Sequence, residues 1–241
     1  MSSSTPGRKV AIPAAVKPLL ARIGRLAEAQ QMRAYAVGGC VRDWQLRRCG
    51  LDLDIAVEGD GIALAKAAAK ALGARLQAHE QFGTASLRLS SGPIRRVDLA
   101  SCRRETYARP AAYPKVVPGT LDEDLFRRDF TINAMAVALT PGRLGVLVDP
   151  FHGAADLRRR QLRMLHRRSF VDDPSRILRG IRFAVRFRLR WEPATARALR
   201  AAMGEGALGR LNAGRLRREL DRMLEEEDPR ACLQRLAELG A

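Results

Sequence analysis

The chain has few of the residues from which metal modules, disulfide frameworks and imidazole-based active sites are built. Its 241 residues include three histidines and four cysteines, and no two cysteines form a C-x-x-C pair. This spacing argues against a zinc module and a disulfide framework, so we expect free thiols in a reducing compartment. With only His79, His152 and His166 present, a mechanism based on imidazole is not expected. The sequence also lacks P-loop, H-E-x-x-H and Ser-His-Asp patterns.

Long apolar runs are absent as well. No segment approaches the roughly 20 apolar residues that a membrane-spanning helix needs. Residues 1–15 are polar, contain scattered prolines and lack the apolar region of a secretory signal, so we expect a loose tail there. A cytoplasmic location without membrane association is therefore predicted.

Positive charge, in contrast, is abundant. The formal net charge is +17, from 43 lysines and arginines against 26 aspartates and glutamates. Such an excess attracts polyanions by electrostatic steering and counterion release, so nucleic acid is the expected partner. Only five of the basic residues are lysines, and a GC-rich genome would also favour arginine over lysine. That bias does not by itself create a surplus over the acidic residues, so we favour nucleic-acid binding.

The stretch from Tyr35 to Val57 begins with a strand and a glycine turn. Tyr35 to Val37 predicts a short strand, which Gly38 and Gly39 end. A backbone without Cβ atoms can approach a ligand closely there and point its N–H groups at phosphate oxygens. Arg42 adds a planar, permanently charged fork for a phosphate. Taken alone, the Gly-Gly pair also fits a plain turn.

A second strand is predicted from Leu51 to Val57, and its alternation places Asp52 and Asp54 on one face. Two carboxylates that point the same way repel each other unless a cation lies between them. Mg²⁺ beside a nucleoside triphosphate is the usual solution. A polar face on a half-solvated sheet would produce the same alternation. The glycine turn followed by this strand is more specific than either motif alone.

A β-hairpin is predicted next. Phe82 to Leu89 and Ile94 to Ala100 alternate between apolar and polar residues, and the S-S-G-P between them is turn material. Asp98 lies in the second strand of this hairpin. It either joins the acidic pair as a third catalytic carboxylate or pairs with Arg95 or Arg96 at the surface, because the sequence does not fix the neighbours in a sheet.

The first part of the chain also holds two predicted helices and a loop. Val16 to Gln31 shows a helical apolar stripe, and Gly61 to Leu72 is rich in alanine and followed by Gly73 as a C-cap. Cys102 to Thr120 contains three prolines and no apolar period, so we predict a long loop. Loops of this length are usually functional or disordered.

A further helix is predicted to begin at Thr120, which forms a T-x-x-E capping box with Glu123, and to extend to Leu139. Three polar residues interrupt its apolar pattern, namely Arg128, Asp129 and Asn133. They form either a solvated face with an internal ion pair or a functional cluster.

Strand patterns stop near residue 150. We therefore predict a tail over residues 1–15, an α+β domain over 16–150 and an all-helical domain over 151–241. In the helical domain, SFVDDPSRILRGIRFAVRF predicts a helix capped by Asp172 or Asp173. Opposite its apolar stripe lies a row of arginines, which are Arg176, Arg179, Arg182 and Arg186. Such a row is usually a solvated basic face, but beside a metal site it would clamp phosphates and base edges.

Five motifs closely resemble, in this order, those of class II tRNA nucleotidyltransferases and bacterial poly(A) polymerases. They are GGCVRD, LDLDIAV, DEDLFRRDFTINAMA, VDPFHGAADL and DDPSRILRGIRF. The resemblance extends from about Tyr35 to Phe187. It implies an α+β fold, in which a polymerase-beta-like nucleotidyltransferase head with a small mixed sheet flanked by helices precedes an all-α, RNA-binding neck.

The resemblance also implies roles for the residues of the first two motifs. Gly38, Gly39 and Arg42 match the residues that bind the triphosphate. Asp52 and Asp54 match the carboxylates that hold two Mg²⁺ ions. Metal-assisted attack of an RNA 3′-hydroxyl on the α-phosphate of CTP or ATP is the implied reaction.

Further implied roles concern the nucleotide's sugar and base. Arg128, Asp129 and Asn133 match a helix that senses the ribose and the phosphates. Asp173 and Arg176 match the pair that meets the Watson–Crick edge of C or A, so that protein serves as the template. The arginines beside this pair are matched by Arg179 and Arg182. One departure is Asp172, where the family usually has Glu, and RLRREL resembles a later helical motif more weakly.

Within the family, NAMA after RRDFTIN fits the tRNA enzymes better than the poly(A) polymerases. The loop from Arg103 to Thr120 is similar to a flexible loop of A-incorporating members. We therefore expect tRNA as partner, ATP and CTP as substrates and Mg²⁺ as cofactor. A bacterial poly(A) polymerase and a non-catalytic basic RNA-binding protein are the alternatives. Because the family's body and tail helices would follow residue 241, a truncated or minimal member is expected.

Overall fold

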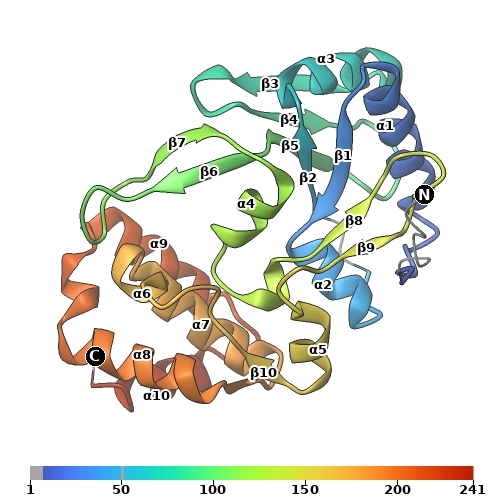
Figure 1. The fold of residues 1–241 in the computed structure, drawn as a ribbon. Coiled ribbons are helices and arrows are strands. Elements are labelled where there is room, and N and C mark those ends of the chain that lie inside the picture. The colour runs from blue at the N-terminus through green and yellow to red at the C-terminus, as the bar shows by residue number, and fades with distance from the viewer. Residues whose placement is uncertain (1–7, 50–51, 241) are drawn as a thin grey trace, which may run out of the picture. The chain divides into compact units, whose positions relative to one another are not determined.

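The computed structural model describes residues 8–49 and 52–240. The chain divides into two compact units, each of which brings together distant parts of the sequence (Figure 1). Unit 1 contains the chain up to Arg104, Val116–Arg127 and Asn133–Ala154, and unit 2 contains Glu105–Lys115, Arg128–Ile132 and the residues from Ala155 on. The domain limits given by the sequence pattern stay a prediction.

Unit 1 is built on a seven-stranded mixed sheet with the strand order β3-β4-β5-β2-β1-β8-β9 (Figure 1). The strands are β1 (Arg33–Val37), β2 (Leu53–Glu58), β3 (Arg75–His79), β4 (Thr84–Arg88), β5 (Arg96–Ser101), β8 (Ala136–Ala138) and β9 (Leu147–Val148). β2 and β5 are parallel, and the other neighbouring pairs are antiparallel. The predicted hairpin is confirmed as β4 with β5.

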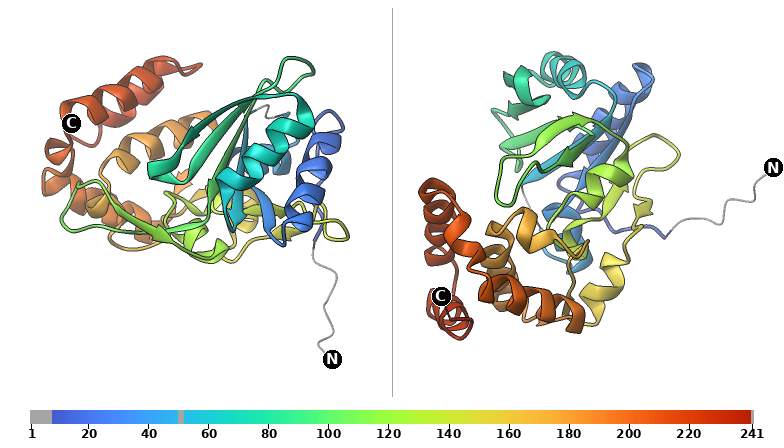
Figure 2. Two further views of the ribbon diagram at one scale, coloured as in Figure 1. Left: turned by 90° about the horizontal axis from the view of Figure 1, so that it is seen from above. Right: turned by 60° about the vertical axis from the view of Figure 1, so that its left-hand side comes forward.

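Two helices pack on one face of this sheet, α1 (Lys17–Ala29) on β1 and α3 (Gly61–Leu72) on β4 and β5 (Figure 2). Strand β2 shows why the two faces differ. Leu53 and Ile55 are 1% exposed in the core, whereas Asp54 between them is exposed. Burying each such apolar side chain contributes about 1.5–3 kcal/mol. On the other face of β2, Asp54 is exposed whereas Ala56 is 2% exposed, so this face is open at Asp54 and covered further along the strand.

Gly24 on α1 gives a direct test of this packing. A Cβ at Gly24 would lie 1.8 Å from the carbonyl oxygen of Leu139, which is backbone and has no rotamer to change. We expect Gly24→Ala to lower the free energy of unfolding by about 3 kcal/mol, because overpacking forces the backbone to shift. Urea unfolding measures this loss. The control is Gly204→Ala, since nothing lies within 4 Å of a Cβ there, and equal stability of both variants would contradict the packing.

The prediction of a helix from Thr120 to Leu139 is wrong beyond Phe126. The capping box forms, with the hydroxyl of Thr120 accepting from the N–H of Glu123 at 3.3 Å, but α4 (Leu121–Phe126) ends early. A 3₁₀ turn over Thr131–Asn133 and strand β8 follow. Residues 130–139 are all buried. A segment buried on every side carries no amphipathic signal, so its apolar residues matched a helical period without forming a helix.

Two short elements differ from the sequence-based expectation in the same part of the chain. The predicted loop from Cys102 to Thr120 contains a two-stranded ribbon of β6 (Arg103–Thr106) and β7 (Lys115–Pro118). Helix α2 (Gly39–Gln45) follows the glycine turn and was not predicted. Both elements are too short for a periodicity argument to detect.

Unit 2 is mainly helical. Its helices are α6 (Ser169–Asp172), α7 (Ser175–Arg186), α8 (Pro193–Gly204), α9 (Ala213–Leu224) and α10 (Pro229–Ala237), and α5 (Gly153–Arg158) precedes them. Helices α9 and α10 pack on α7 (Figure 2). A parallel pair of two-residue strands, β10 (Gln161–Leu162) and β11 (Arg190–Trp191), corrects the all-helical expectation. None of the described helices is long and apolar enough to cross a membrane.

An aromatic cluster forms the core of unit 2. The ring of Phe130 lies 6.3 Å from Phe170, 6.1 Å from Phe183 and 6.0 Å from Trp191, measured between centroids. Gly180 lets α7 approach this cluster, because a Cβ there would lie 2.3 Å from the Trp191 ring. The segment around Phe130 is thus fixed in unit 2 by packing.

Candidate active site

The glycine turn of unit 1 follows β1 as predicted. Gly38 has a φ of 75°, which side chains rarely adopt, and is the N-cap of α2. Gly39 begins the helix, and a Cβ there would make only an ordinary contact with Arg42. The backbone conformation therefore favours glycine at position 38, whereas a Cβ at position 39 would meet no steric conflict.

Arg42 and Asn133, which lie 91 positions apart, meet in this unit. The guanidinium of Arg42 donates from Nη1 to Oδ1 of Asn133 at 2.7 Å and from Nε to Asp43 at 2.9 Å. Both Arg42 and Asn133 are 6% exposed. These contacts hold the guanidinium in a defined orientation, which is what recognition of a phosphate by an arginine fork requires.

Two carboxylates, Asp54 and Asp98, lie on the face of the sheet opposite α1 and α3, and a third, Asp52, directly precedes β2. Asp52 and Asp54 are exposed, and Asp54 is the direct partner of Asp98 in the parallel pair of β2 and β5. Asp98 also accepts hydrogen bonds from Ser86 and, at 2.9 Å, from Arg96. The structure shows the ion pair with Arg96 and places Asp98 beside Asp54, while a catalytic role of Asp98 stays a prediction.

The pKa of Arg96 reflects these carboxylates. Its hydrogen bond to Asp98 raises its pKa, and the negative charges of Asp98, Asp54 and Asp52 raise it further. A cation placed on this face therefore experiences the field of three carboxylates. The surroundings of Asp52, Asp54 and Asp98 are therefore suited to positive charge.

The acidic pair fits a divalent cation that is shared with a substrate. No group of three acidic, histidine or cysteine residues among those described is arranged to hold an ion by itself. Mg²⁺, however, is usually held by one or two carboxylates together with water and substrate phosphates. Asp52 and Asp54 supply two exposed carboxylates of this kind.

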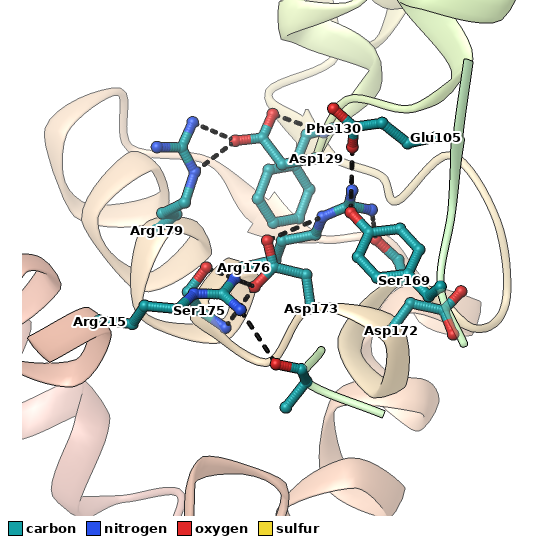
Figure 3. A network of polar contacts seen from close by, with 12 residues as sticks. Glu105, Asp129, Phe130, Ser169, Asp172, Asp173, Ser175, Arg176, Arg179 and Arg215 are labelled. Carbon is teal, nitrogen blue, oxygen red and sulfur yellow. Dashed lines mark hydrogen bonds and ion pairs between the residues drawn. The ribbon is translucent and has the colours of Figure 1, made fainter. Parts of the chain in front are cut away.

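In unit 2, buried Asp129 and half-buried Arg179 form an ion pair (Figure 3). Oδ2 of Asp129 accepts from Nε of Arg179 at 2.8 Å and from Nη2 at 2.6 Å, while Oδ1 accepts from the Phe130 N–H at 2.8 Å. The charge of Asp129 raises the pKa of Arg179. Asp129 is 6% exposed, and half-buried Arg128 precedes it. The polar residues of this segment are therefore not the solvated helix face that was one interpretation of the pattern.

Asp173 is fixed by a network of hydrogen bonds (Figure 3). Its Oδ1 accepts from the Ser175 N–H at 3.1 Å, from the Ser175 hydroxyl at 2.6 Å and from Nη2 of Arg215 on α9. Arg215 also donates to the carbonyl of Ala111 at 3.2 Å and lies over the ring of Tyr113 at 5.6 Å. Arg215 was not predicted as a site residue, although the weak RLRREL resemblance includes it.

Arg176 lies beside Asp173, with 3.9 Å between Nε and Oδ2, and is 4% exposed. Its Nη1 donates to the Ser169 hydroxyl at 2.8 Å and lies 3.3 Å from Nε2 of His166. Burial and the charge of Arg176 lower the pKa of His166, so the imidazole is neutral at pH 7 and accepts this hydrogen bond. His166 and Ser169 thus help to orient Arg176 beside the carboxylate of Asp173.

The remaining arginines of α7 bind acidic residues. Nε of Arg182 donates to Glu226 at 2.9 Å, and Nη1 lies 3.3 Å from Glu219 on α9. Glu226 also accepts two hydrogen bonds from Arg186, each 2.7 Å long. Arg176 and Arg182 are 4% and 8% exposed, so these two do not belong to a solvated basic face, whereas Arg186 is exposed. Contact between Arg182 and a nucleotide stays a prediction.

Comparison with known proteins agrees with these features. The model of the poly A polymerase head domain matches residues 34–163. The A-adding tRNA nucleotidyltransferase of Halalkalibacterium halodurans is 40% identical over 223 residues, which are 92% of this chain and 52% of that protein. The CC-adding tRNA nucleotidyltransferase of Deinococcus radiodurans is 44% identical over 157 residues, or 65% of this chain and 41% of that protein.

Solved structures give the same result. A CCA-adding enzyme in its apo form II superimposes with a TM-score of 0.90 at 43% identity, over 95% of this chain and 54% of that chain. The Thermotoga maritima CCA-adding enzyme complexed with tRNA gives a TM-score of 0.85 at 40% identity, over 98% of this chain and 55% of that chain. This chain thus spans about half the length of these structures. The predicted α+β nucleotidyltransferase fold is confirmed, and the chain belongs to the poly A polymerase head domain family, as its ordered motifs predicted.

Proposed function

We propose that the chain carries the catalytic part of a tRNA nucleotidyltransferase, which adds C, A or both to the 3′ end of tRNA. The supporting observation is that the carboxylates of Asp52 and Asp54 are exposed and that Asp54 lies beside Asp98 on one face of the sheet. Such a face can receive a nucleotide and an RNA end at the same time. The A-adding and CC-adding names of the relatives support tRNA as the RNA.

In the proposed reaction the 3′-hydroxyl oxygen of the RNA attacks the α-phosphorus of CTP or ATP, and pyrophosphate leaves. Asp52 and Asp54 would hold Mg²⁺, which lowers the pKa of the hydroxyl and neutralises the charge on the leaving pyrophosphate. Gly38, Gly39 and Arg42 bind the triphosphate. Positioning and neutralisation of charge supply most of the rate in such reactions, so no side chain needs to form a covalent bond.

Asn133 has a supporting task in this proposal. Its Oδ1 accepts from Nη1 of Arg42 at 2.7 Å and thereby aims the guanidinium. Asp98 serves as the third carboxylate, next to Asp54. A cytoplasmic location is part of this proposal.

Unit 2 supplies the choice of base in this proposal. Asp173 accepts and Arg176 donates hydrogen bonds, so together they complement the Watson–Crick edge of C or A. Arg215 and Ser175 hold the carboxylate of Asp173 in place. Four residues are proposed to contact the ribose and the phosphates or to support this pair, namely Arg128, Asp129, Arg179 and Arg182.

A selectivity measurement tests this role. We expect Arg215→Ala to change the ratio of kcat/KM for CTP and ATP by about tenfold. Losing the hydrogen bond that orients Asp173 costs roughly 1.4 kcal/mol, which corresponds to that factor. The inhibition constant of inorganic tripolyphosphate, which reports on triphosphate binding alone, should stay unchanged. Arg217→Ala is the matched control, since Arg217 lies on the same helix with 84% of its side chain exposed. An unchanged ratio in the Arg215 variant would refute the role of Asp173 as a template.

A bacterial poly(A) polymerase is the alternative enzyme. It would use the same carboxylates but extend unrelated RNA with A alone. Offering CTP beside ATP on a tRNA that lacks its 3′ end, and on an unrelated RNA of equal length, separates the two activities. A non-catalytic RNA-binding protein would bind both RNAs and release no pyrophosphate when Mg²⁺ is added.

A further inference from the structure

Three arginines lie in a row across the sheet of unit 1. The register makes Arg75 of β3 the direct partner of Arg88 of β4, and Arg88 the direct partner of Arg96 of β5. Directly opposed residues in antiparallel strands point to the same face. We call these three residues the arginine ladder.

The ladder lies on the same face as the acidic site. Arg96 precedes Asp98 by two residues and is ion-paired with it at 2.9 Å, so the two side chains share a face. Asp98 is in turn the partner of Asp54. The ladder therefore begins at the proposed catalytic carboxylates and extends away from them to the edge strand β3. With strands about 4.8 Å apart, its three positions span about 10 Å.

The ladder is open to solvent and incompletely neutralised. All three arginines are exposed, and 58% of the Arg96 side chain is accessible. Only Arg96 has an acidic partner among the residues that the structure describes, because no described carboxylate lies within 4.0 Å of the Arg75 or Arg88 guanidinium. Like charges directly opposite each other destabilise a sheet. An anion lying along the row would remove this repulsion.

The position of the ladder relative to β2 in the strand order indicates which anion it binds. In the strand order, β1 and the glycine turn lie on one side of β2, whereas β5, β4 and β3 lie on the other. The triphosphate residues follow β1. In a phosphoryl transfer the attacking and leaving oxygens lie roughly in line on opposite sides of the phosphorus. With pyrophosphate leaving on the β1 side, the attacking 3′-hydroxyl comes from the β5 side, where the ladder is.

We propose that Arg75, Arg88 and Arg96 form a track for the phosphates of the RNA 3′ end and thereby guide its terminal hydroxyl to Asp52 and Asp54. This proposal rests on the proposed function. The guanidinium forks match phosphate oxygens in geometry and charge, and a rigid sheet keeps them in register. The contacts are made to the backbone, so the track holds RNA without regard to its sequence.

The test measures RNA binding and nucleotide binding separately on the full chain. The variant is Arg75→Ala with Arg88→Ala. The control is Arg25→Ala with Lys66→Ala, which removes the same charge from exposed positions of α1 and α3 on the opposite face. The probes are a fluorescent RNA that ends in CC and a fluorescent ATP analogue. Thermal unfolding of each variant checks the fold.

We expect the ladder variant to raise the Kd for RNA about tenfold and to leave ATP binding unchanged, whereas the control changes the Kd for RNA less than threefold. The slope of log Kd against log salt should fall by about 0.7 for each RNA phosphate that the variant no longer neutralises. Because opposed charges are removed, the variant should unfold at no lower temperature than the wild type.

Three results would overturn the proposal. An unchanged Kd for RNA in the ladder variant would show that the ladder does not bind RNA. An equal loss of RNA affinity in the control would show that only net charge matters. A loss of ATP binding would reassign the ladder to the triphosphate. Nucleotide incorporation by the wild type is measured in parallel. Incorporation without an effect of the ladder variant on RNA binding would support the proposed function and contradict the track. An effect on RNA binding without incorporation would contradict the proposed function and leave only RNA binding by the ladder.

Discussion

Asp54→Ala is expected to lower nucleotide incorporation by about a thousandfold. The carboxylate is one of two proposed to hold Mg²⁺, and loss of several kcal/mol of charge stabilisation in the transition state corresponds to that factor. Asp54 is exposed between buried Leu53 and Ile55, so its removal leaves the core intact. Steady-state incorporation on tRNA ending in CC measures the loss, and unfolding in urea should match the wild type.

The controls for this variant separate position from charge. Asp54→Glu keeps the charge but moves the carboxylate outward, so we expect a loss of comparable order. Glu28→Ala removes one negative charge from an exposed position of α1, which covers the opposite face, and should retain full activity. Binding of Mn²⁺, followed by its paramagnetic resonance signal, should weaken in both Asp54 variants. Near-normal incorporation by Asp54→Ala would contradict the assignment of the metal site.

Glu226→Ala is expected to lower the free energy of unfolding by about 3 kcal/mol, which is the usual effect of breaking a buried ion pair. Glu226 is 8% exposed and accepts hydrogen bonds from both Arg182 and Arg186. Its removal leaves the guanidinium of Arg182 buried, with Glu219 as its remaining acidic partner among the residues that the structure describes. Unfolding in urea, followed by circular dichroism of the helical signal, measures the loss.

A second substitution distinguishes the loss of a pair from the loss of volume. Combining Glu226→Leu with Arg182→Met replaces the ion pair by apolar side chains, and we expect it to recover most of the stability. Glu227→Ala removes an exposed carboxylate one position further on and should change stability by less than about 0.5 kcal/mol. If Glu227→Ala were as harmful as Glu226→Ala, the ion pairs between α7 and the segment that follows α9 would not stabilise unit 2.

The sequence was sufficient to predict the parts of the fold in which periodicity and burial agree. At the start of β2, Asp54 is exposed between buried Leu53 and Ile55, as the alternation of the sequence predicted, while Asp52 directly precedes the strand. The segment from Phe130 to Leu139 is buried on all sides, and its apolar residues therefore fit a helix or a strand equally well. Sequence periodicity carries no information that separates these cases.

The site residues show a similar division. Local spacing indicated the glycine turn and the acidic strand, and it placed Asp98 correctly in a strand. It did not indicate that Arg42 meets Asn133 or that Arg215 holds Asp173, because these pairs depend on contacts between residues 91 and 42 positions apart. The arginine ladder depends on strand register, which the sequence alone does not fix.

Incorporation on three tRNAs tests the proposed function most directly. The tRNAs end before the first C, after C and after CC, and each is offered CTP or ATP separately with Mg²⁺. The proposed function predicts the release of pyrophosphate and the addition of a few nucleotides, with the accepted triphosphate set by the tRNA end, and no such product from Asp54→Ala. Long A tails on unrelated RNA, or binding of tRNA without any incorporation by the wild type, would contradict it.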